Sequence, residues 1–165
     1  METTFARTNK NPLLGTLKKS DELAEVKVIY TSKRKGITRL TSSKDAYGIL
    51  YPLFDQDTIE FKEDFFLLVL NRANTVLGWV RLSSGGTCGT VVDVKIIFMI
   101  ALLTNAHCII MCHNHPSGNL TASREDILLT NRVKEVGKIL NVYLYDHIII
   151  CKGDSYFSFA NEGLL

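Results

Sequence analysis

Apolar runs of strand length recur through the main part of the chain. The segments Phe65–Leu70 and Ala106–Cys112 are almost continuously apolar, which is typical of strands that are buried on both faces. Phe65–Leu70 is followed by a turn over Asn71–Asn74 and a second apolar stretch, Thr75–Leu82, so this region predicts a β-hairpin. Further strands are expected at Glu25–Thr31, Val142–Cys151 and Tyr156–Phe159.

Helical patterns fall between these strands, and three helices are predicted, over Lys44–Leu50, from the cap Asp93 to about Thr104, and over Ser123–Leu140. Ser42 or Ser43 can cap the first helix, which ends before Pro52 because proline cannot continue it. The apolar stretch Ile96–Cys112 is interrupted by polar residues and is shorter than the roughly 20 apolar residues that span a bilayer. We expect a buried helix followed by a buried strand there.

The alternation of strands and helices predicts an α/β fold, with a mixed β-sheet flanked by helices on both faces. At 165 residues the chain has room for one compact domain. Residues 1–22 show no periodicity and are expected to form a flexible tail, which leaves residues 23–165 as the domain. No apolar leader segment is present, so a cytoplasmic location without membrane association is expected.

Composition adds little about the partner of the protein. Hydrophobic residues make up 46% of the chain and charged residues 22%, which excludes a disordered or fibrous protein. The formal net charge of +2 is too small to indicate nucleic acid. The densest basic cluster, formed by Lys33, Arg34, Lys35 and Arg39, is either a phosphate-contacting patch or an ordinary solvated loop.

Four cysteines are present, at positions 88, 108, 112 and 151, and they form no Cys-x-x-Cys pair. A disulfide framework is therefore not expected, and buried free thiols are the favoured interpretation. Cys108 and Cys112 lie four residues apart on a predicted strand, so both face one side of it. They are also conceivable as soft metal ligands beside the nearby histidines.

The segment between the last buried strand and the last helix carries the clearest chemistry. His113 and His115 leave a strand at positions i and i+2, so their side chains can point to one side. Asp126 lies in the first turn of the following helix and brings a carboxylate near the same loop. Two imidazoles and one carboxylate leave an open position on a tetrahedral zinc ion, as catalytic sites do. The alternative for Ser123 and Asp126 is a capping box that satisfies free helix N–H groups.

These residues follow the pattern His-x-His-Pro, six residues, Ser, two residues, Asp. The pattern resembles the metal signature of the JAB/MPN (JAMM) family of zinc metallopeptidases. Three segments and one further residue are more narrowly similar to the RadC-like branch, namely His113–Gly118, Ser123–Asp126, Asp146–Ile149 and Thr130. The resemblance extends over about Glu25–Leu165. It implies a three-layer α/β arrangement like that of cytidine deaminases.

The resemblance also implies roles for individual residues. His113, His115 and Asp126 would bind Zn²⁺, and the hydroxyl of Ser123 would help to stabilise the oxyanion. Family members use a glutamate from an earlier strand as general base, and Glu63 is the best positional match, with Glu60 as the substitute. Zinc-activated water needs such a carboxylate to take its proton. The alternative for Glu63 is an exposed charge at the start of a strand.

The chain departs from the pattern of its relatives at two positions. Ala122 stands where many have proline, and Lys95 stands where RadC-like chains usually carry arginine, which loses a planar bidentate donor. His147 has two interpretations: it either supports the site or contacts substrate, or it is a core histidine with satisfied hydrogen bonds.

The leading hypothesis is a zinc-dependent hydrolase that cuts peptide or isopeptide bonds in a peptide or protein substrate. The resemblance also implies an alternative, because RadC-like proteins have been labelled DNA repair proteins. In that case the metal site would be structural or vestigial, and the basic cluster would provide weak DNA association. A third hypothesis is a module that binds a peptide tail without cutting it.

Overall fold

The structure is a computed structural model that describes residues 38–85 and 92–165. Four expectations from the sequence lie outside these residues: the flexible tail with its boundary at residue 22, the strand Glu25–Thr31, the basic residues 33–35, and Cys88.

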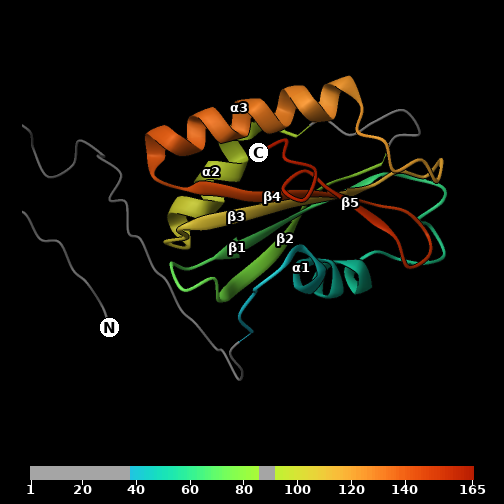
Figure 1. Cartoon of the computed structure of the whole chain (residues 1–165), viewed down its shortest axis with the longest axis horizontal. Coiled ribbons are helices and arrows are strands. Elements are labelled where there is room, and N and C mark those ends of the chain that lie inside the picture. Colours follow the sequence, from blue (N-terminus) through green and yellow to red (C-terminus); the bar gives the residue numbers. More distant parts are fainter. Residues whose placement is uncertain (1–37, 86–91) are drawn as a thin grey trace, which may run out of the picture. The chain divides into compact units, whose positions relative to one another are not determined.

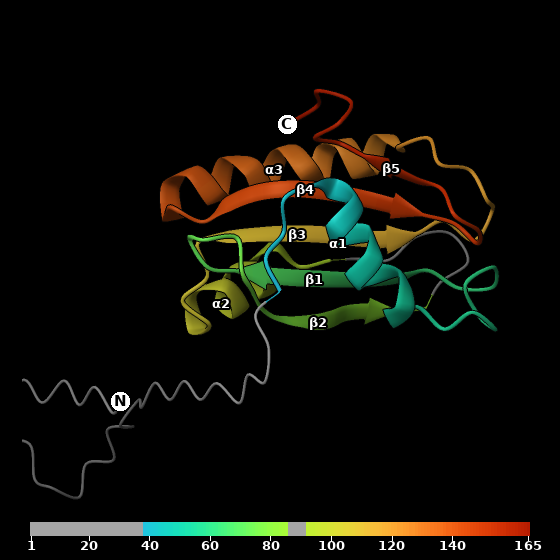
Figure 2. The ribbon, with the colours of Figure 1, turned by 60° about the horizontal axis from the view of Figure 1, so that its bottom comes forward.

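The described strands form one mixed sheet in the order β2-β1-β3-β4-β5 (Figure 2). Their bounds are β1 Asp64–Leu70, β2 Val76–Ser84, β3 Cys108–Asn114, β4 Tyr143–Ile150 and β5 Tyr156–Ser158. β1 pairs antiparallel with both β2 and β3, β3 pairs parallel with β4, and β4 pairs antiparallel with β5. The predicted hairpin and the predicted mixed sheet are both confirmed.

Helices cover both faces of this sheet (Figure 1). Helix α1 (Ser43–Leu50) lies on one face and continues into the short 3₁₀ helix η2 (Tyr51–Leu53), while α2 (Val94–Leu103) and α3 (Arg124–Leu140) lie on the other. The side chains of Ser42, Asp93 and Ser123 accept hydrogen bonds from the first turns of the three α-helices, as N-caps do. The predicted α/β fold with three layers is therefore confirmed.

The core follows from the alternation of side chains along the strands. Every residue of β1 and β3 is buried. On β1, Phe66, Leu68 and Leu70 pack toward α1, and on β3 Ile110 does the same. The intervening residues pack toward α2 and α3; they are Phe65, Leu67 and Val69 on β1, and Ile109 and Met111 on β3. The sheet thus separates two apolar layers.

Two predictions about the apolar stretch between residues 96 and 112 need correction. Strand β3 does not end at Cys112 but continues to Asn114, because His113 and Asn114 still pair with the neighbouring strands. Helix α2 is not buried on all sides, because only the face with Ile97 and Ala101 is covered. The side chains on its other face are exposed, namely Ile96, Met99, Leu102 and Leu103.

The described cysteines, Cys108, Cys112 and Cys151, are buried and free, as expected. Cys108 and Cys112 pack in the layer beneath α1. Met111 packs in the opposite layer, and His113 follows it on the same face of β3. The sheet therefore separates the two thiols from the histidines, and burial raises their pKa values. These contacts favour small hydrophobic side chains over metal ligands.

Among the helices that the structure describes, none is long and apolar enough to cross a membrane.

Gly137 allows the last turns of α3 to lie close to Val142, the residue before β4. Asn141 ends the helix in the left-handed conformation (φ 55°), and the N–H of Val142 then donates to the carbonyl of Gly137 at 2.9 Å. A β-carbon at position 137 would overlap the carbonyl oxygen of Val142. Glycine is required here for space rather than for backbone freedom.

We therefore expect Gly137→Ala to lower the free energy of unfolding by about 1–3 kcal/mol, although alanine favours helices by about 1 kcal/mol. The matched control is Gly48→Ala in α1, where nothing lies within 4 Å of the added carbon. That variant should gain about 0.5–1 kcal/mol. Urea denaturation of the two variants measures both changes, and equal stability of the two would contradict the close-approach argument.

Candidate metal centre

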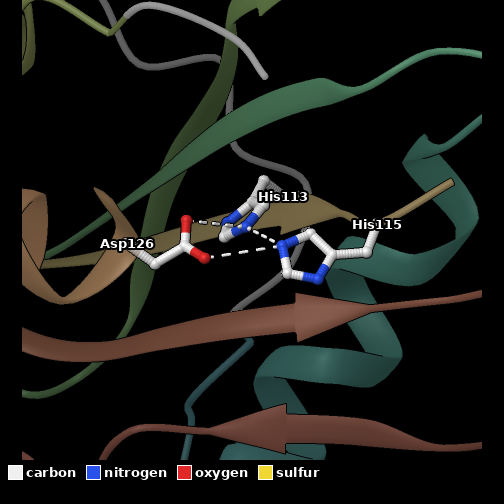
Figure 3. A group of neighbouring side chains, drawn as sticks. All are labelled: His113, His115 and Asp126. Carbon is white, nitrogen blue, oxygen red and sulfur yellow. Dashed lines mark hydrogen bonds and ion pairs between the residues drawn. The ribbon is translucent and has the colours of Figure 1, made fainter. Parts of the chain in front are cut away.

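The side chains of His113, His115 and Asp126 converge where β3 ends and α3 begins (Figure 3). Oδ1 of Asp126 lies 3.1 Å from Nε2 of His113, and Oδ2 lies 3.5 Å from Nε2 of His115. The two Nε2 atoms are 3.0 Å apart. The structure thus brings together the three residues that the sequence predicts as metal ligands.

Strand β3 directs both histidines to the same face of the sheet. His113 is paired with Phe65 of β1 and Ile149 of β4, and its ring stacks on Phe65 with centroids 5.6 Å apart. His115 follows the strand, but its N–H donates to the carbonyl of Ile150 at 2.9 Å. This bond keeps the backbone extended, so His115 lies above the same face as His113.

The loop after His115 folds back and fixes its ring. Gly118 adopts a left-handed conformation (φ 77°), and its N–H donates to the carbonyl of His115 at 3.1 Å. The carbonyl of Asn119 lies 2.7 Å from Nδ1 of His115. Because a carbonyl only accepts hydrogen bonds, Nδ1–H donates to it, which leaves Nε2 as the nitrogen directed at Asp126 and His113.

Ser123 holds the carboxylate of Asp126 at the first turn of α3. Oδ2 of Asp126 accepts hydrogen bonds from the backbone N–H (2.7 Å) and the hydroxyl of Ser123, and the N–H of Asp126 donates to the hydroxyl oxygen at 3.1 Å. The capping box considered from the sequence is therefore present. It leaves Oδ1 directed at His113. The role of Ser123 as an oxyanion donor stays a prediction.

The separations between the three donor groups fit a metal ion. Ligand atoms at about 2.0–2.1 Å from a tetrahedral zinc ion lie about 3.3 Å from one another. The two Nε2 atoms are 3.0 Å apart and Oδ1 of Asp126 lies 3.1 Å from Nε2 of His113, both near that edge length, while Oδ2 of Asp126 lies 3.5 Å from Nε2 of His115. Two imidazole nitrogens and a carboxylate also suit a transition metal better than calcium or magnesium, which prefer oxygen ligands. The group could therefore hold a metal ion.

The electrostatics of the metal-free site agree with this arrangement. Burial opposes ionisation of Asp126, but the hydrogen bonds from His113 and His115 prevail and hold its pKa far below the usual range. The hydrogen bond to Asp126 raises the pKa of His115 above its ordinary value, and the negative charge of Glu63 contributes to the same shift. The site thus concentrates negative potential where a cation would bind.

Glu63 precedes β1 and lies near the three ligands. β1 and β3 pair Phe65 with His113, so the antiparallel register continued by two residues places Glu63 next to His115. Glu63 is half-buried, and its charge acts on the pKa of His115. Glu60 is placed differently: it is exposed and forms an ion pair with Lys152 at 2.6 Å. These positions favour Glu63 over Glu60 as the base.

Lys95 is the second residue of α2. It is exposed at the start of α2 and lines a cavity of about 410 Å³ together with residues of α2 and α3, including Val136 and Leu140. None of the three converging residues lines that cavity. The effect of lysine in place of arginine at this position stays a prediction.

Asn114 is a site residue that the sequence interpretation missed. It alternates with the two histidines, so its side chain points to the opposite face of β3, where it is fully buried. Its oxygen accepts the N–H of Asp64 at 2.7 Å, and its amide donates to the carbonyls of Ile59 (2.7 Å) and Lys62 (2.9 Å). These three bonds bracket Glu63 and fix the segment that carries it.

Two further polar side chains, His147 of β4 and Thr130 of α3, lie behind His113 and are buried. Nε2 of His147 lies 2.9 Å from Nδ1 of His113, and Nδ1 of His147 lies 2.7 Å from the hydroxyl of Thr130. His147 is thus a core histidine with both nitrogens paired, and one of its partners is a candidate ligand. For His147, the sequence indicated this role by placing Asp146 and His147 together on a predicted strand. The role of Thr130 was not predicted.

Comparison with known proteins identifies the class to which this fold and site belong. Residues 40–164 match the family model of the RadC-like JAB domain. The chain therefore belongs to the RadC-like JAB domain family, as its resemblance indicates.

Relatives are found in bacteria and archaea. A UPF0758 protein of Flavobacterium johnsoniae is 41% identical over 128 residues, which make up 78% of this chain and 54% of the relative. UPF0758 proteins of Porphyromonas gingivalis and Methanosarcina acetivorans are 40% identical over 126 residues and 38% identical over 127 residues. These two matches cover 76% and 77% of this chain and 54% of each relative. The chain spans about half the length of the relatives that it matches.

The contacts of Asn114 lead to a prediction about stability. Asn114→Ala leaves the N–H of Asp64 and two carbonyls without these partners, and each such buried loss costs about 1–3 kcal/mol. Asn131→Ala, at an exposed position of α3, is the control and should change stability by less than about 0.5 kcal/mol. Chemical denaturation of both variants measures the difference; an equally small effect in both would refute the anchoring role.

Proposed function

We propose that the protein is a zinc-dependent hydrolase of amide bonds, peptide or isopeptide, in a peptide or protein substrate. The observation that carries this proposal is the convergence of two imidazoles and one carboxylate at separations that suit tetrahedral zinc. The side chains of His115 and Asp126 are 16% and 13% exposed, so the group reaches the surface. An accessible three-ligand set is typical of catalytic rather than structural zinc.

Zinc held by these ligands would supply Lewis acidity, which makes water a competent nucleophile near neutral pH and polarises an amide carbonyl. The remaining chemistry falls to the side chains of the protein. Water adds its oxygen to the carbonyl carbon, the C–N bond breaks, and one proton must move from the water to the leaving nitrogen.

Glu63 is the proposed carrier of that proton. Its carboxylate takes the proton from the attacking water and donates it to the amine as the C–N bond breaks. The antiparallel register beside His115 and the anchoring of its segment by Asn114 support this assignment. Glu60 is less suited because its carboxylate is exposed and paired with Lys152.

Ser123 is the proposed donor to the oxyanion. Its hydroxyl can turn from Oδ2 of Asp126 toward a negatively charged substrate oxygen, because its backbone N–H still holds the same carboxylate at 2.7 Å. The two groups of Ser123 thus allow one residue to orient a ligand and to assist the reaction.

The alternative, a DNA-associated accessory protein, stays a prediction. The sequence feature that favoured it is the basic cluster at positions 33–39. Of this cluster the structure describes Arg39, which is exposed and pairs with Thr75 of the hairpin turn. Weak DNA association would show as binding that falls steeply with salt.

Metal analysis tests the ligand set. We expect the wild type, after dialysis, to retain about one zinc ion per chain. Asp126→Ala should retain far less, because it removes one of the three donors. Glu125→Ala, at the exposed neighbouring position, is the control and should retain zinc as the wild type does. Stoichiometric zinc in both the wild type and Asp126→Ala, or in neither, would refute the proposed site.

Hydrolysis of peptide and isopeptide libraries tests the chemistry. Glu63→Gln should keep its zinc and lose about 10²–10⁴-fold in kcat, the usual contribution of a general base. Glu60→Gln should retain activity within about twofold, because a surface ion pair contributes little. Equal activity of Glu63→Gln and wild type would remove the proposed base. Zinc binding without turnover in the wild type would instead identify a peptide-binding module.

A further inference from the structure

A chain of hydrogen bonds runs behind the candidate metal centre and links α3 to His113 through β4. The hydroxyl oxygen of Thr130 lies 2.6 Å from the backbone carbonyl oxygen of Asp126 and 2.7 Å from Nδ1 of His147. Nε2 of His147 lies 2.9 Å from Nδ1 of His113. Thr130 and His147 are 1% and 0% exposed, so these bonds are shielded from solvent.

The backbone carbonyl of Asp126 determines which atom donates in each of these hydrogen bonds. A carbonyl cannot donate, so the hydroxyl hydrogen of Thr130 points at Asp126. The oxygen of Thr130 must then accept from His147, which places the proton of His147 on Nδ1. Neutral His147 therefore presents a lone pair on Nε2, and His113 donates to it through Nδ1–H.

The surroundings of His147 favour its neutral form. The ring stacks on Phe159 with centroids 4.8 Å apart and lies against Phe65 at 5.7 Å. Burial among these rings disfavours a charged imidazole, because the ring is shielded from water. The ring therefore has one donor and one acceptor, and both are used.

We propose that Thr130 and His147 are positioning residues that keep a proton on Nδ1 of His113 and so leave Nε2, the nitrogen that faces Asp126, as the atom that binds the metal. This inference rests on the proposed function, because it concerns a ligand of the same site. Thr130 and His147 would not contact the metal themselves, but they would prepare His113 to bind it. The carbonyl of Asn119 does the same for His115.

Loss of the Thr130 hydroxyl would reverse donor and acceptor in the hydrogen bond between His147 and His113. Without it, the Nδ1–H of His147 would face a buried position with no acceptor, which is costly. His147 would gain by carrying its proton on Nε2 and donating to Nδ1 of His113. The proton of His113 would then lie on Nε2, the atom that faces Asp126 and His115. Metal binding would first have to restore the original tautomer.

The experiment compares zinc affinity, measured by competition with a chromogenic chelator, among folded variants. Thr130→Val should bind about 10–100-fold more weakly than wild type, as is typical when the partner of a ligating histidine is lost. Thr130→Ser keeps the hydroxyl and should stay within about threefold. Equal affinity of the Val and Ser variants would overturn the inference. Thermal unfolding confirms that each variant is folded.

A second pair of variants acts at His147. His147→Phe keeps an aromatic ring beside Phe159 but removes the acceptor, and should also bind zinc about 10–100-fold more weakly. His147→Gln can still offer an oxygen to His113 and should recover most of that loss. If His147→Phe bound zinc as wild type does, the inference would fail.

The tautomers can be read directly from the metal-free wild type by long-range ¹H–¹⁵N correlation spectra. We expect a proton on Nδ1 and none on Nε2 of His147, and a proton on Nδ1 of His113. A proton on Nε2 of His147 would overturn the inference and leave the proposed function standing. Failure of the wild type to bind zinc would end the proposed function, whereas the spectra would still decide the tautomers.

Discussion

The pairing of β3 on both of its edges is the constraint on which the rest of the structure depends. β1 pairs with it as far as His113 and β4 pairs with it as far as Asn114, so the backbone stays extended to the end of the strand. Side chains of such a strand must alternate between the two layers. The pairing therefore sends the histidines toward α3 and sends Asn114 into the layer beneath α1. A shift of one residue would exchange these faces and dismantle the site.

Three polar side chains at this end of the sheet, those of Asn114, His147 and Asp126, are tolerated because each has hydrogen-bond partners. An unpaired buried polar group costs free energy that a small domain cannot readily recover. Asn114 uses its oxygen and its amide on backbone groups, and His147 uses both ring nitrogens. Asp126 accepts from Ser123 on one oxygen and faces His113 with the other. Ligand placement and helix capping are thus achieved by the same carboxylate.

The sequence predicted those features that depend on local pattern. Apolar runs located the strands, caps such as Ser123 located the helices, and the spacing of His113 and His115 indicated a shared face. The end of β3 was missed because polar residues broke the apolar run, although pairing with β1 continues to His113 and pairing with β4 continues to Asn114. The hydrogen bonds of Asn114 and Thr130 reach other elements, up to 55 residues away, so no local pattern could reveal them. Tertiary contacts decide such bonds.

The capping box at the start of α3 would affect how tightly and how selectively this group holds a metal ion. Asp126 is oriented by Ser123, and His115 by the carbonyl of Asn119, before any ion arrives. The entropy of ordering these donors is therefore spent during folding and does not weaken the affinity for the ion. A cage fixed in advance also discriminates by size, because ions that need longer bonds or more oxygens must deform the helix terminus to bind.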